Sequence, residues 1–360
     1  MAAIVDMTID TWLAQQRDLE DCILFQTSGS AGKPKHVALS HSALQASAAA
    51  VNTHLQATRD DVWLGVLPRH HIGGYSINTR AELSGASAVW SDKKWDPLAF
   101  CKDCGQHDVT LTSLVPTQVY DLVSAAYQAP PALRAVLVGG GALSDTLNER
   151  ALALSWPILK TYGMTETASQ VATQRPGSAA DAPLAILPGW ETDLTTDGFL
   201  RLRGKALFSG YIMEDSPEEF RFAPHDGWFT TADRVSINDN NNSLTFFARD
   251  RDRLKIKGEL VNLANLRTEL EAAAQSCQCP PANSTLVAVD DPRDGQTLVL
   301  VAPQREHAAL IKALTARIPS FLHPKQAVSL NALPRTALGK LDETSLAETV
   351  DALTPDDCQP

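Results

Sequence analysis

Hydrophobic positions between about residues 20 and 160 alternate between short apolar runs and helical periodicity. Leu44, Ala48, Val51 and Leu55 recur at steps of four, three and four, which predicts one apolar helix face that begins after an N-cap at Ser40. The short apolar runs predict buried strands at Ile23–Phe25, Val62–Leu67, Val109–Leu114 and Ala135–Val138. This alternation indicates an α/β layer with a mainly parallel sheet, in which ligands gather beyond the C-terminal ends of the strands.

The pattern changes after about residue 183, where short strands and turns replace the alternation of strand and helix. By composition, residues 239–242 form a turn between two strands. Helical periodicity returns at Leu263–Ala274 and Ala308–Ile318, and strand-like runs lie between them at Leu286–Val289 and Leu298–Val301. The last part of the chain therefore predicts a small α+β domain of its own.

The composition of the chain excludes several classes of protein. The 360 residues carry 31 Lys and Arg against 42 Asp and Glu, a net charge of −11, which argues against a nucleic-acid binder with a basic face. Asp6 and Asp10 stand where a signal peptide needs basic and then apolar residues, and no run reaches the ~18 apolar residues of a membrane span. We therefore expect a cytoplasmic protein with no nucleic-acid partner and no membrane insertion.

The cysteines raise the question of a zinc site. Cys101 and Cys104 lie near His107, and Cys277 lies two residues before Cys279. Neither pair has the partner spacing of a zinc ribbon or finger, so we interpret the cysteines as reduced thiols.

The segment Thr27–Lys35 predicts a phosphate-binding loop. Its glycines let the backbone approach a ligand, its hydroxyl and N–H groups donate to phosphate oxygens, and Lys33 and Lys35 add positive charge. A Walker A loop is excluded, because Thr27 takes the place of its first glycine and Pro34 the place of its Ser/Thr. The alternative interpretation is an ordinary polar turn.

This loop and four later stretches resemble, in the same order, the motifs of the adenylate-forming superfamily of acyl-CoA synthetases, luciferases and peptide-synthetase adenylation domains. The four later stretches are Tyr162–Thr167, Asp226–Asp233, Arg249–Glu259 and Pro334–Lys340. Five matches in register are far more specific than one. The resemblance implies a large N-terminal α/β domain, residues 1–251, truncated relative to the superfamily, and a small mobile α+β lid domain, residues 252–360.

The resemblance also implies ATP, Mg²⁺ and CoA as cofactor and substrates. A carboxylate attacks the α-phosphate of ATP, anion on anion, so positive charge must surround the transition state. Thr165 would touch the α-phosphate, Glu166 would hold Mg²⁺, and Lys340 would bridge the acyl carboxylate and the α-phosphate. The implied ATP-binding residues are Thr27, Ser28, Gly29, Ser30, Gly32, Lys35, Gly139, Gly140, Gly141, Tyr162, Gly163, Met164, Asp233 and Arg249. The implied hinge and CoA residues are Asp252, Lys257, Gly258 and Glu259.

The sequence departs from the superfamily pattern in three places. Ala232 and Ala248 replace glycines, and we expect nucleotide binding to survive these changes unless either backbone needs a positive φ. Only about twenty residues precede the phosphate loop, where relatives carry a further subdomain. From that shortened face we expect exposed apolar surface and association into a homodimer.

The acid substrate must be inferred from residues 67–80, which include His71. Arg80 follows nine residues later, and this spacing resembles the o-succinylbenzoate–CoA ligases of menaquinone and phylloquinone synthesis. Their substrate has two carboxylates, so the one that does not react needs a cation, which Arg80 would supply. The alternative is that Arg80 packs on the surface of a helix. The implied acyl-site residues are His71, Arg80, Ser113, Thr117 and Ser169, and His71 would also influence the thioester step.

The predicted function is an ATP-dependent carboxylic acid–CoA ligase that forms an acyl-adenylate and then a thioester, with the aromatic dicarboxylate 2-succinylbenzoate as the acid. One alternative is a ligase for another aromatic or short-chain acid. Another is a non-catalytic nucleotide-binding descendant, which the joint presence of Glu166, Asp233 and Lys340 disfavours.

Overall fold

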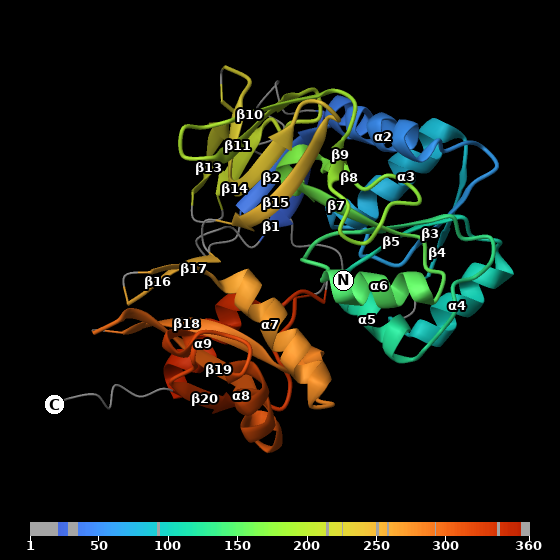
Figure 1. The fold of residues 1–360 in the computed structure, drawn as a ribbon. Helices are drawn as coiled ribbons and strands as arrows, with labels where there is room; N and C mark the ends of the chain where they lie inside the picture. The colour runs from blue at the N-terminus through green and yellow to red at the C-terminus, as the bar shows by residue number, and fades with distance from the viewer. Residues whose placement is uncertain are drawn as a thin grey trace. The chain divides into compact units, whose positions relative to one another are not determined.

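The computed structural model describes residues 21–27, 35–91, 94–213, 216–224, 226–249, 252–257, 259–291, 293–336 and 339–353 (Figure 1). Contacts between Cα atoms divide the chain into two compact units. Unit 1 comprises Met1–Thr231 and Val235–Phe246, and unit 2 comprises Ala232–Arg234 and Phe247–Pro360. The predicted domain boundary between residues 251 and 252, and the predicted mobility of the domain that follows it, stay predictions.

Unit 1 contains a parallel sheet in the order β4-β3-β5-β6-β7. Its strands are β3 (Val62–Gly65), β4 (Ser87–Trp90), β5 (Leu111–Leu114), β6 (Ala135–Val138) and β7 (Ile158–Met164). The predicted α/β class and the three predicted central strands are confirmed. The inner strands β3, β5 and β6 are mostly buried on both faces, as is typical of a parallel sheet covered by helices on both sides.

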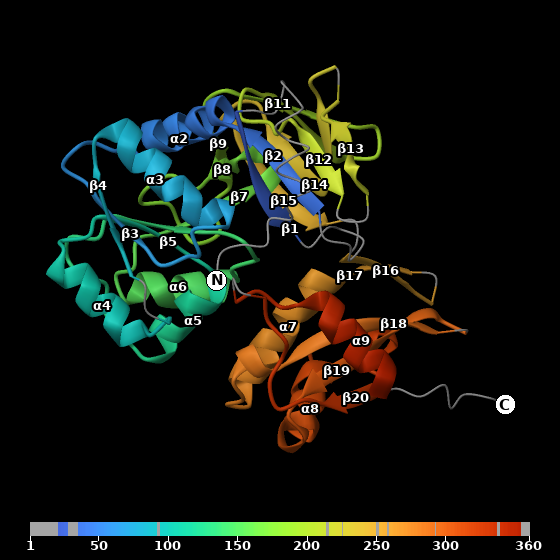
Figure 2. The same cartoon turned by 180° about the vertical axis from the view of Figure 1, so that it is seen from behind.

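Helices cover both faces of this parallel sheet (Figures 1 and 2). On one face, α2 (His41–Leu55) and α3 (Ile72–Ser84) pack against a core that includes Trp63 and Leu111. On the other, α4 (Pro97–Gln106), α5 (Pro116–Ser124) and α6 (Asp145–Ala153) pack against a core that includes Leu64 and Leu114. Adjacent strand residues thus serve opposite cores, as the pleat requires. The predicted N-cap is confirmed, because the Ser40 hydroxyl accepts a hydrogen bond from Ala43 N at 3.1 Å.

The sheet continues beyond β7 as antiparallel strands in the order β8-β9-β15-β14-β11-β10. These strands are β8 (Ser169–Thr173), β9 (Leu184–Ile186), β10 (Trp190–Leu194), β11 (Phe199–Gly204), β14 (Phe229–Asn238) and β15 (Ser243–Arg249). The predicted turn at residues 239–242 joins β14 to β15 and is confirmed.

A separate antiparallel sheet contains β1 (Cys22–Thr27), β2 (Lys35–Ser40), β12 (Gly210–Met213) and β13 (Ser216–Phe222), in that order. The sequence predicted a strand at Ile23–Phe25 but did not predict β2. It also did not indicate that β2 pairs with β12, far away in the chain (Figure 2).

Unit 2 contains a sheet in the order β17-β16-β19-β18, with β20 parallel to β19. Its strands are β16 (Arg253–Ile256), β17 (Glu259–Asn262), β18 (Thr285–Asp291), β19 (Gly295–Ala302) and β20 (Gln326–Ser329), and its helices are α7 (Leu263–Ser276), α8 (His307–Thr315) and α9 (Glu343–Leu353). One core lies under α7 and α8, and a second includes Leu346 and Val350 of α9. The predicted small α+β domain is therefore confirmed.

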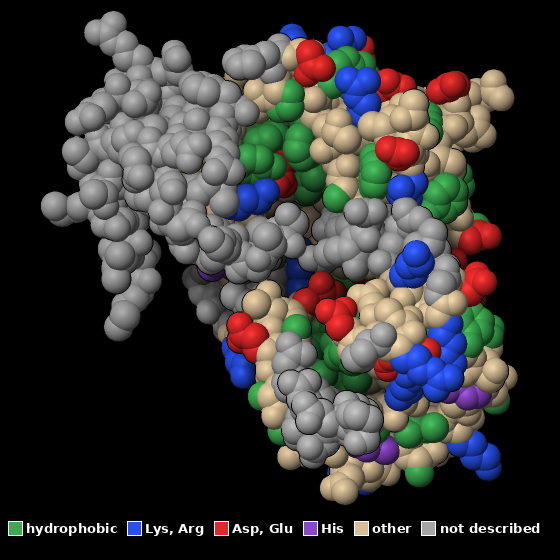
Figure 3. Space-filling model, turned by 90° about the vertical axis from the view of Figure 1, so that its left-hand side faces the viewer, with side chains coloured by type: hydrophobic (Ala, Val, Ile, Leu, Met, Phe, Trp, Pro, Cys, Tyr) green, Lys and Arg blue, Asp and Glu red, His purple; other side chains and the backbone are tan. Residues whose placement is uncertain are grey.

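The surface of the described residues carries charges of both signs. On the face drawn in Figure 3, acidic and basic side chains are interspersed among apolar and uncharged polar ones. Among the described helices, none is long and apolar enough to cross a membrane.

Candidate active site

The β1–β2 hairpin brings the two ends of the predicted phosphate loop together. Thr27 and Lys35 are paired at the end of the hairpin next to the connecting loop, and Thr27 Oγ1 donates to the carbonyl oxygen of Lys35 at 3.5 Å. The predicted loop residues Ser28, Gly29, Ser30 and Gly32 lie outside the described residues.

A cluster of three polar side chains lies beside this hairpin. Lys35 Nζ and the hydroxyl of Tyr211 both donate to Glu166 Oε1, each at 2.9 Å. The Lys35 ammonium also lies 3.7 Å from the centroid of the Tyr211 ring, a cation–π contact. Burial, followed by the negative charge of Glu166, raises the pKa of Tyr211 well above its ordinary value, so its hydroxyl is a donor at neutral pH. The carboxylate of Glu166 is therefore held in one orientation.

The turn that carries Glu166 has unusual backbone geometry. It follows β7 as a short 3₁₀ helix, Thr165–Thr167, and Ala168 and Ser169 then adopt positive φ values of 49° and 121°. A Cβ atom on Gly163 would lie 1.8 Å from the carbonyl oxygen of Ser169, so only glycine fits there. Non-glycine residues in such conformations cost about 1–3 kcal/mol each and cluster at functional sites.

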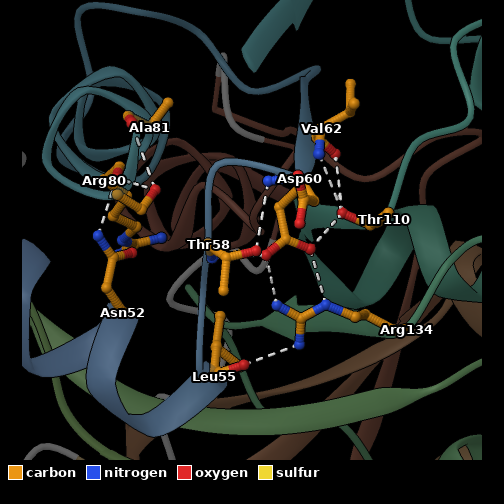
Figure 4. Close-up of polar contacts among 11 residues, drawn as sticks. Asn52, Leu55, Thr58, Asp60, Val62, Arg80, Ala81, Thr110 and Arg134 are labelled. Carbon is orange, nitrogen blue, oxygen red and sulfur yellow. Dashed lines mark hydrogen bonds and ion pairs between the residues drawn. The ribbon is translucent and has the colours of Figure 1, made fainter. Parts of the chain in front are cut away.

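Arg80 lies on α3 and is almost completely buried, with 1% of its surface exposed. Its Nη2 donates to Ser169 Oγ at 2.8 Å, and its guanidinium carbon lies 5.6 Å from the centroid of the Trp63 ring. Its Nε has no hydrogen-bond partner among the described residues. Figure 4 shows Arg80 beside Asn52, which donates to the Arg80 carbonyl oxygen at 2.8 Å. Packing on a helix surface is therefore wrong for this residue.

The charge of Arg80 is not neutralised by its surroundings. No described carboxylate forms an ion pair with it. Burial lowers the pKa of Arg80 to about 9, below its ordinary value, yet the group stays protonated at neutral pH. Arg80 is thus a buried cation that lacks a counter-ion within the described part of the chain.

Small residues lie within β5 and directly after β6. Ser113 lies on the same face of β5 as Leu111, which packs in the core under α3. The buried Ser113 hydroxyl has no hydrogen-bond partner among the described residues. At Gly139, a Cβ atom would lie 2.5 Å from Thr161 Oγ1, and Gly140 has a φ of 79°. Gly141 follows on the same exposed turn.

The remaining predicted acyl-site residues lie at helix starts. His71 is the N-cap residue of α3, with its ring 4.4 Å from that of His70, and Thr117 lies in the first turn of α5. Of the predicted acyl-site residues, the structure joins Arg80 to Ser169 by a hydrogen bond.

Several predicted nucleotide, hinge and lid residues lie on other elements. Asp233 is buried on β14 and Arg249 ends β15. Lys257 has a φ of 51° and its ammonium lies 3.8 Å from Asp294, whereas Gly258 is outside the described residues. Asp252 precedes β16, Glu259 begins β17, and Lys340 is exposed next to a bridge between Arg335 and Leu341.

Comparison with known proteins decides the family. Residues 10–211, more than half of the chain, match the family model described as AMP-binding enzyme. The chain belongs to the AMP-binding enzyme family.

A curated relative, the 2-succinylbenzoate–CoA ligase of Listeria monocytogenes serotype 4b, is 28% identical over 331 residues, which cover 89% of this chain and 68% of the relative. The Bacillus subtilis o-succinylbenzoate CoA synthetase in complex with the acyl-adenylate intermediate OSB-AMP superposes with a TM-score of 0.73 at 26% identity, over 90% of this chain and 68% of that one. The same synthetase in complex with ATP and magnesium ion gives a TM-score of 0.72 at 26% identity, over 90% and 69%.

The donor set at Glu166 suits the magnesium ion expected in an AMP-binding enzyme. Magnesium in nucleotide sites is usually held by one or two carboxylates together with phosphates and waters. Glu166 offers one carboxylate, and its Oε2 accepts no hydrogen bond from the described residues. No group of three or more His, Cys, Asp or Glu that could hold a metal is present in the described part of the chain, so a dedicated metal cage is not what this site offers.

The sequence did not single out Tyr211 as a residue of the site. Tyr211 lies in a region of short strands and turns, where a tyrosine is an ordinary strand residue. Its contact with Glu166 depends on the pairing of β12 with β2. Ala232 and Ala248, which replace glycines of the AMP-binding pattern, are not among the described residues with positive φ, so neither backbone requires glycine.

Proposed function

We propose that this chain is an ATP-dependent acid–CoA ligase whose acid substrate is 2-succinylbenzoate. This reaction would be a step in menaquinone or phylloquinone biosynthesis. The observation that carries the choice of acid is Arg80, a buried cation with no described carboxylate partner. Such a charge is costly unless a ligand supplies the anion, and a bidentate bond to a carboxylate would also use its unpaired Nε. The curated relative and the solved synthetases that resemble this chain carry the same substrate in their names.

The first step joins the acid to AMP. A carboxylate oxygen of the acid attacks the α-phosphorus of ATP, and pyrophosphate leaves with the electrons of the broken P–O bond. The second carboxylate would lie against Arg80, with the Ser169 and Ser113 hydroxyls next to it and Thr117 further along the acyl site. Fixing the acid at both ends holds the reacting oxygen in place, which lowers the entropic part of the barrier.

The nucleotide would be held by residues around the β1–β2 hairpin and the turn after β7. We assign the β- and γ-phosphates to Thr27, Lys35 and the loop between them, and the α-phosphate to Thr165. Glu166 would hold Mg²⁺, which when bound offsets the negative charge of the phosphates. Asp233 and Arg249 would bind the ribose hydroxyls, and the adenine would lie against the backbone of Gly139, Gly140 and Gly141 next to Tyr162, Gly163 and Met164.

The second step transfers the acyl group to CoA. The sulfur of CoA attacks the acyl carbonyl carbon, and the bond between this carbon and the phosphate oxygen of AMP breaks. AMP leaves with the bonding electrons, and the thiol gives up its proton. Lys340 would serve the first step, whereas the turn formed by Lys257, Gly258 and Glu259 would serve the second, with Asp252 as the hinge. His71 would influence the thioester step.

Pyrophosphate release tests this proposal most directly. With ATP and Mg²⁺, we expect 2-succinylbenzoate to give a kcat/KM at least about tenfold above benzoate and octanoate, because only the dicarboxylate can pair with Arg80. Equal rates with all three acids would overturn the choice of substrate, and release with none of them would overturn the ligase function.

Substitution of the C-terminal lysine separates the two steps. Lys340→Ala should slow adenylate formation by orders of magnitude, because it removes charge stabilisation made chiefly in the transition state. The same variant, given prepared acyl-adenylate and CoA, should form thioester at nearly the parent rate. Equal slowing of both half-reactions would contradict the use of different lid faces for the two steps.

Homodimer formation and a cytoplasmic location stay predictions. Leu83 and Leu98 are exposed large apolar side chains of unit 1, and such side chains are candidates for burial in an interface. Light scattering at micromolar concentration should give twice the monomer mass, and a monomer would contradict the prediction.

A further inference from the structure

The carboxylate of Glu166 receives both of its described hydrogen bonds on the same oxygen. Lys35 Nζ and the Tyr211 hydroxyl lie 2.9 Å from Oε1, and Oε2 accepts no hydrogen bond from the described residues. The side chain of Glu166 is 13% exposed, so the carboxylate is within reach of a ligand. The two donors therefore fix the orientation of the carboxylate and leave one oxygen for a further partner.

The two donors differ in how firmly they are placed. Tyr211 lies on β12, opposite Val37 of β2, and its ring lies 4.5 Å from that of Phe208. The backbone N–H of Phe208 donates to the carbonyl oxygen of Glu166 at 2.9 Å, so this segment holds both the main chain and the side chain of Glu166. Lys35 is a point charge on a flexible stem, and its ammonium can exchange one anionic partner for another.

A nucleotide polyphosphate offers Lys35 such an alternative partner. When Lys35 moves its ammonium to a phosphate, Glu166 loses one of its two donors and with it part of its fixed orientation. The Tyr211 hydroxyl cannot follow, because the strand pairing and the contact with Phe208 hold its ring in place.

We propose that Tyr211 is a positioning residue for the divalent cation. Its hydroxyl keeps Glu166 oriented, with Oε2 available to Mg²⁺, when the Lys35 side chain leaves Glu166 and pairs with the phosphates instead. This proposal rests on the proposed function only in that the chain binds Mg·ATP, and it does not depend on the acid. Because the Glu166 carboxylate is already oriented, it loses less conformational freedom when the cation binds, and this favours binding of Mg·ATP.

Tyr211→Phe is the decisive variant, because it keeps the ring, its contact with Phe208 and its place under the Lys35 ammonium, and removes only the hydroxyl. We measure ATP binding by isothermal titration calorimetry, once with excess Mg²⁺ and once with EDTA. The dissociation constant with Mg²⁺ should rise about tenfold, the size expected for one lost hydrogen bond to a charged group, while the constant in EDTA should stay within about twofold. The Mg²⁺ concentration that half-saturates binding at fixed ATP should rise as well.

Two further variants make the result specific. Tyr120→Phe removes the hydroxyl of a partly buried tyrosine on α5 that forms no described hydrogen bond with Glu166, and it should change neither dissociation constant. In the Glu166→Gln background, Tyr211→Phe should have no more than about a twofold further effect with Mg²⁺, because the two residues act through one contact.

Two outcomes overturn the proposal. If Tyr211→Phe weakens ATP binding equally with Mg²⁺ and with EDTA, Tyr211 supports the fold or touches the nucleotide and does not act on the cation. If it weakens neither, the hydroxyl has no positioning role. Failure of 2-succinylbenzoate as a substrate would leave these measurements unaffected, since no acid is present in them.

Discussion

Asp61 and Arg80 are both charged residues of unit 1 that are buried from solvent, with 5% and 1% of their surfaces exposed, yet their surroundings differ. Asp61 accepts two hydrogen bonds from Arg134, at 2.8 and 2.7 Å, one from the Thr110 hydroxyl at 2.7 Å and one from Thr58 N at 2.9 Å. Arg80 has the Ser169 hydroxyl and the Trp63 ring, both uncharged, and a bare Nε.

The difference separates a charge that holds the fold together from a charge prepared for a ligand. Burial alone would raise the pKa of Asp61, but the hydrogen bonds from Arg134, Thr58 and Thr110 outweigh it and lower the pKa to about 2. Every oxygen of Asp61 is satisfied by protein groups, so its charged form stabilises the native state. The pKa of Arg80 is also lowered, to about 9, but for a base this disfavours the charged form, because burial opposes the charge and no described anion compensates. A buried polar group left unsatisfied calls for an explanation, and substrate binding supplies one.

The largest effect that we expect from this comparison is on stability at Asp61. Asp61→Ala should lower the free energy of unfolding by about 2–4 kcal/mol, since it breaks the ion pair between buried Asp61 and partly exposed Arg134 and leaves the Thr58 N–H and Thr110 hydroxyl without their acceptor. Urea denaturation followed by circular dichroism measures it. Asp60→Ala is the matched control, because Asp60 is an exposed neighbour of the same type, and it should change stability by less than about 0.5 kcal/mol. Equal effects of the two substitutions would contradict a structural role for the Asp61 cluster.

The second effect is on substrate binding at Arg80. Arg80→Ala should raise the KM for 2-succinylbenzoate by an amount that corresponds to a lost charge-assisted bond, about 1.5–3 kcal/mol, while the KM for ATP hardly changes. Steady-state pyrophosphate release measures both constants. Benzoate is the control substrate, because it lacks the second carboxylate, and its KM should not respond. An unchanged KM for 2-succinylbenzoate would remove the main support for the dicarboxylate.

Sequence reasoning reached Arg80 but not the Asp61 cluster, and the reason is physical. The nine-residue step from His71 to Arg80 lies on one segment, so spacing alone could point to it. Asp61 and Arg134 are 73 residues apart and meet only because β3, β5 and β6 lie side by side. Nothing in the local sequence distinguishes Asp61, which is buried, from Asp60, which is exposed.

The same limit applies to the rest of the site and the fold. The strands β3 and β6 were predictable because each lies in a short apolar run, whereas β2 begins with the polar residues Lys35 and His36, follows a polar loop and pairs with distant β12. The positive φ values of Ala168 and Ser169 could not be predicted, because neither residue is glycine and tertiary contacts impose the turn. Tyr211 was missed for the same reason as Asp61, since its partner Glu166 is brought to it by the fold.

Acid denaturation offers a third and smaller test of the same contrast. The pKa of Asp61 is lowered to about 2, so the stability that its charge contributes is fully present above the unfolded-state pKa near 4 and is lost as pH falls toward 2. The contribution is about 2 kcal/mol, obtained from the difference between the two pKa values. Unfolding free energies measured from pH 5 to pH 2 should fall less steeply in Asp61→Asn than in the parent, since the amide does not titrate. Identical slopes would show that Asp61 does not titrate in this range.

The smallest effect should come from replacing Arg80 by an uncharged side chain of similar length, and it is the sharpest test of what an unpaired buried charge does. In the free enzyme, the charge of Arg80 opposes folding, because among the described residues one hydroxyl and one aromatic ring offset its burial. Replacement of buried charges by apolar residues of similar volume is often neutral or stabilising. Arg80→Met should therefore leave the free energy of unfolding unchanged or raise it by no more than about 1 kcal/mol, even though it should weaken 2-succinylbenzoate binding as Arg80→Ala does. Urea denaturation without substrate measures this value, and repetition with saturating 2-succinylbenzoate should stabilise the parent but not the variant. A loss of several kcal/mol in the substrate-free variant would place Arg80 with Asp61, as a residue that holds the fold together rather than one kept for the acid.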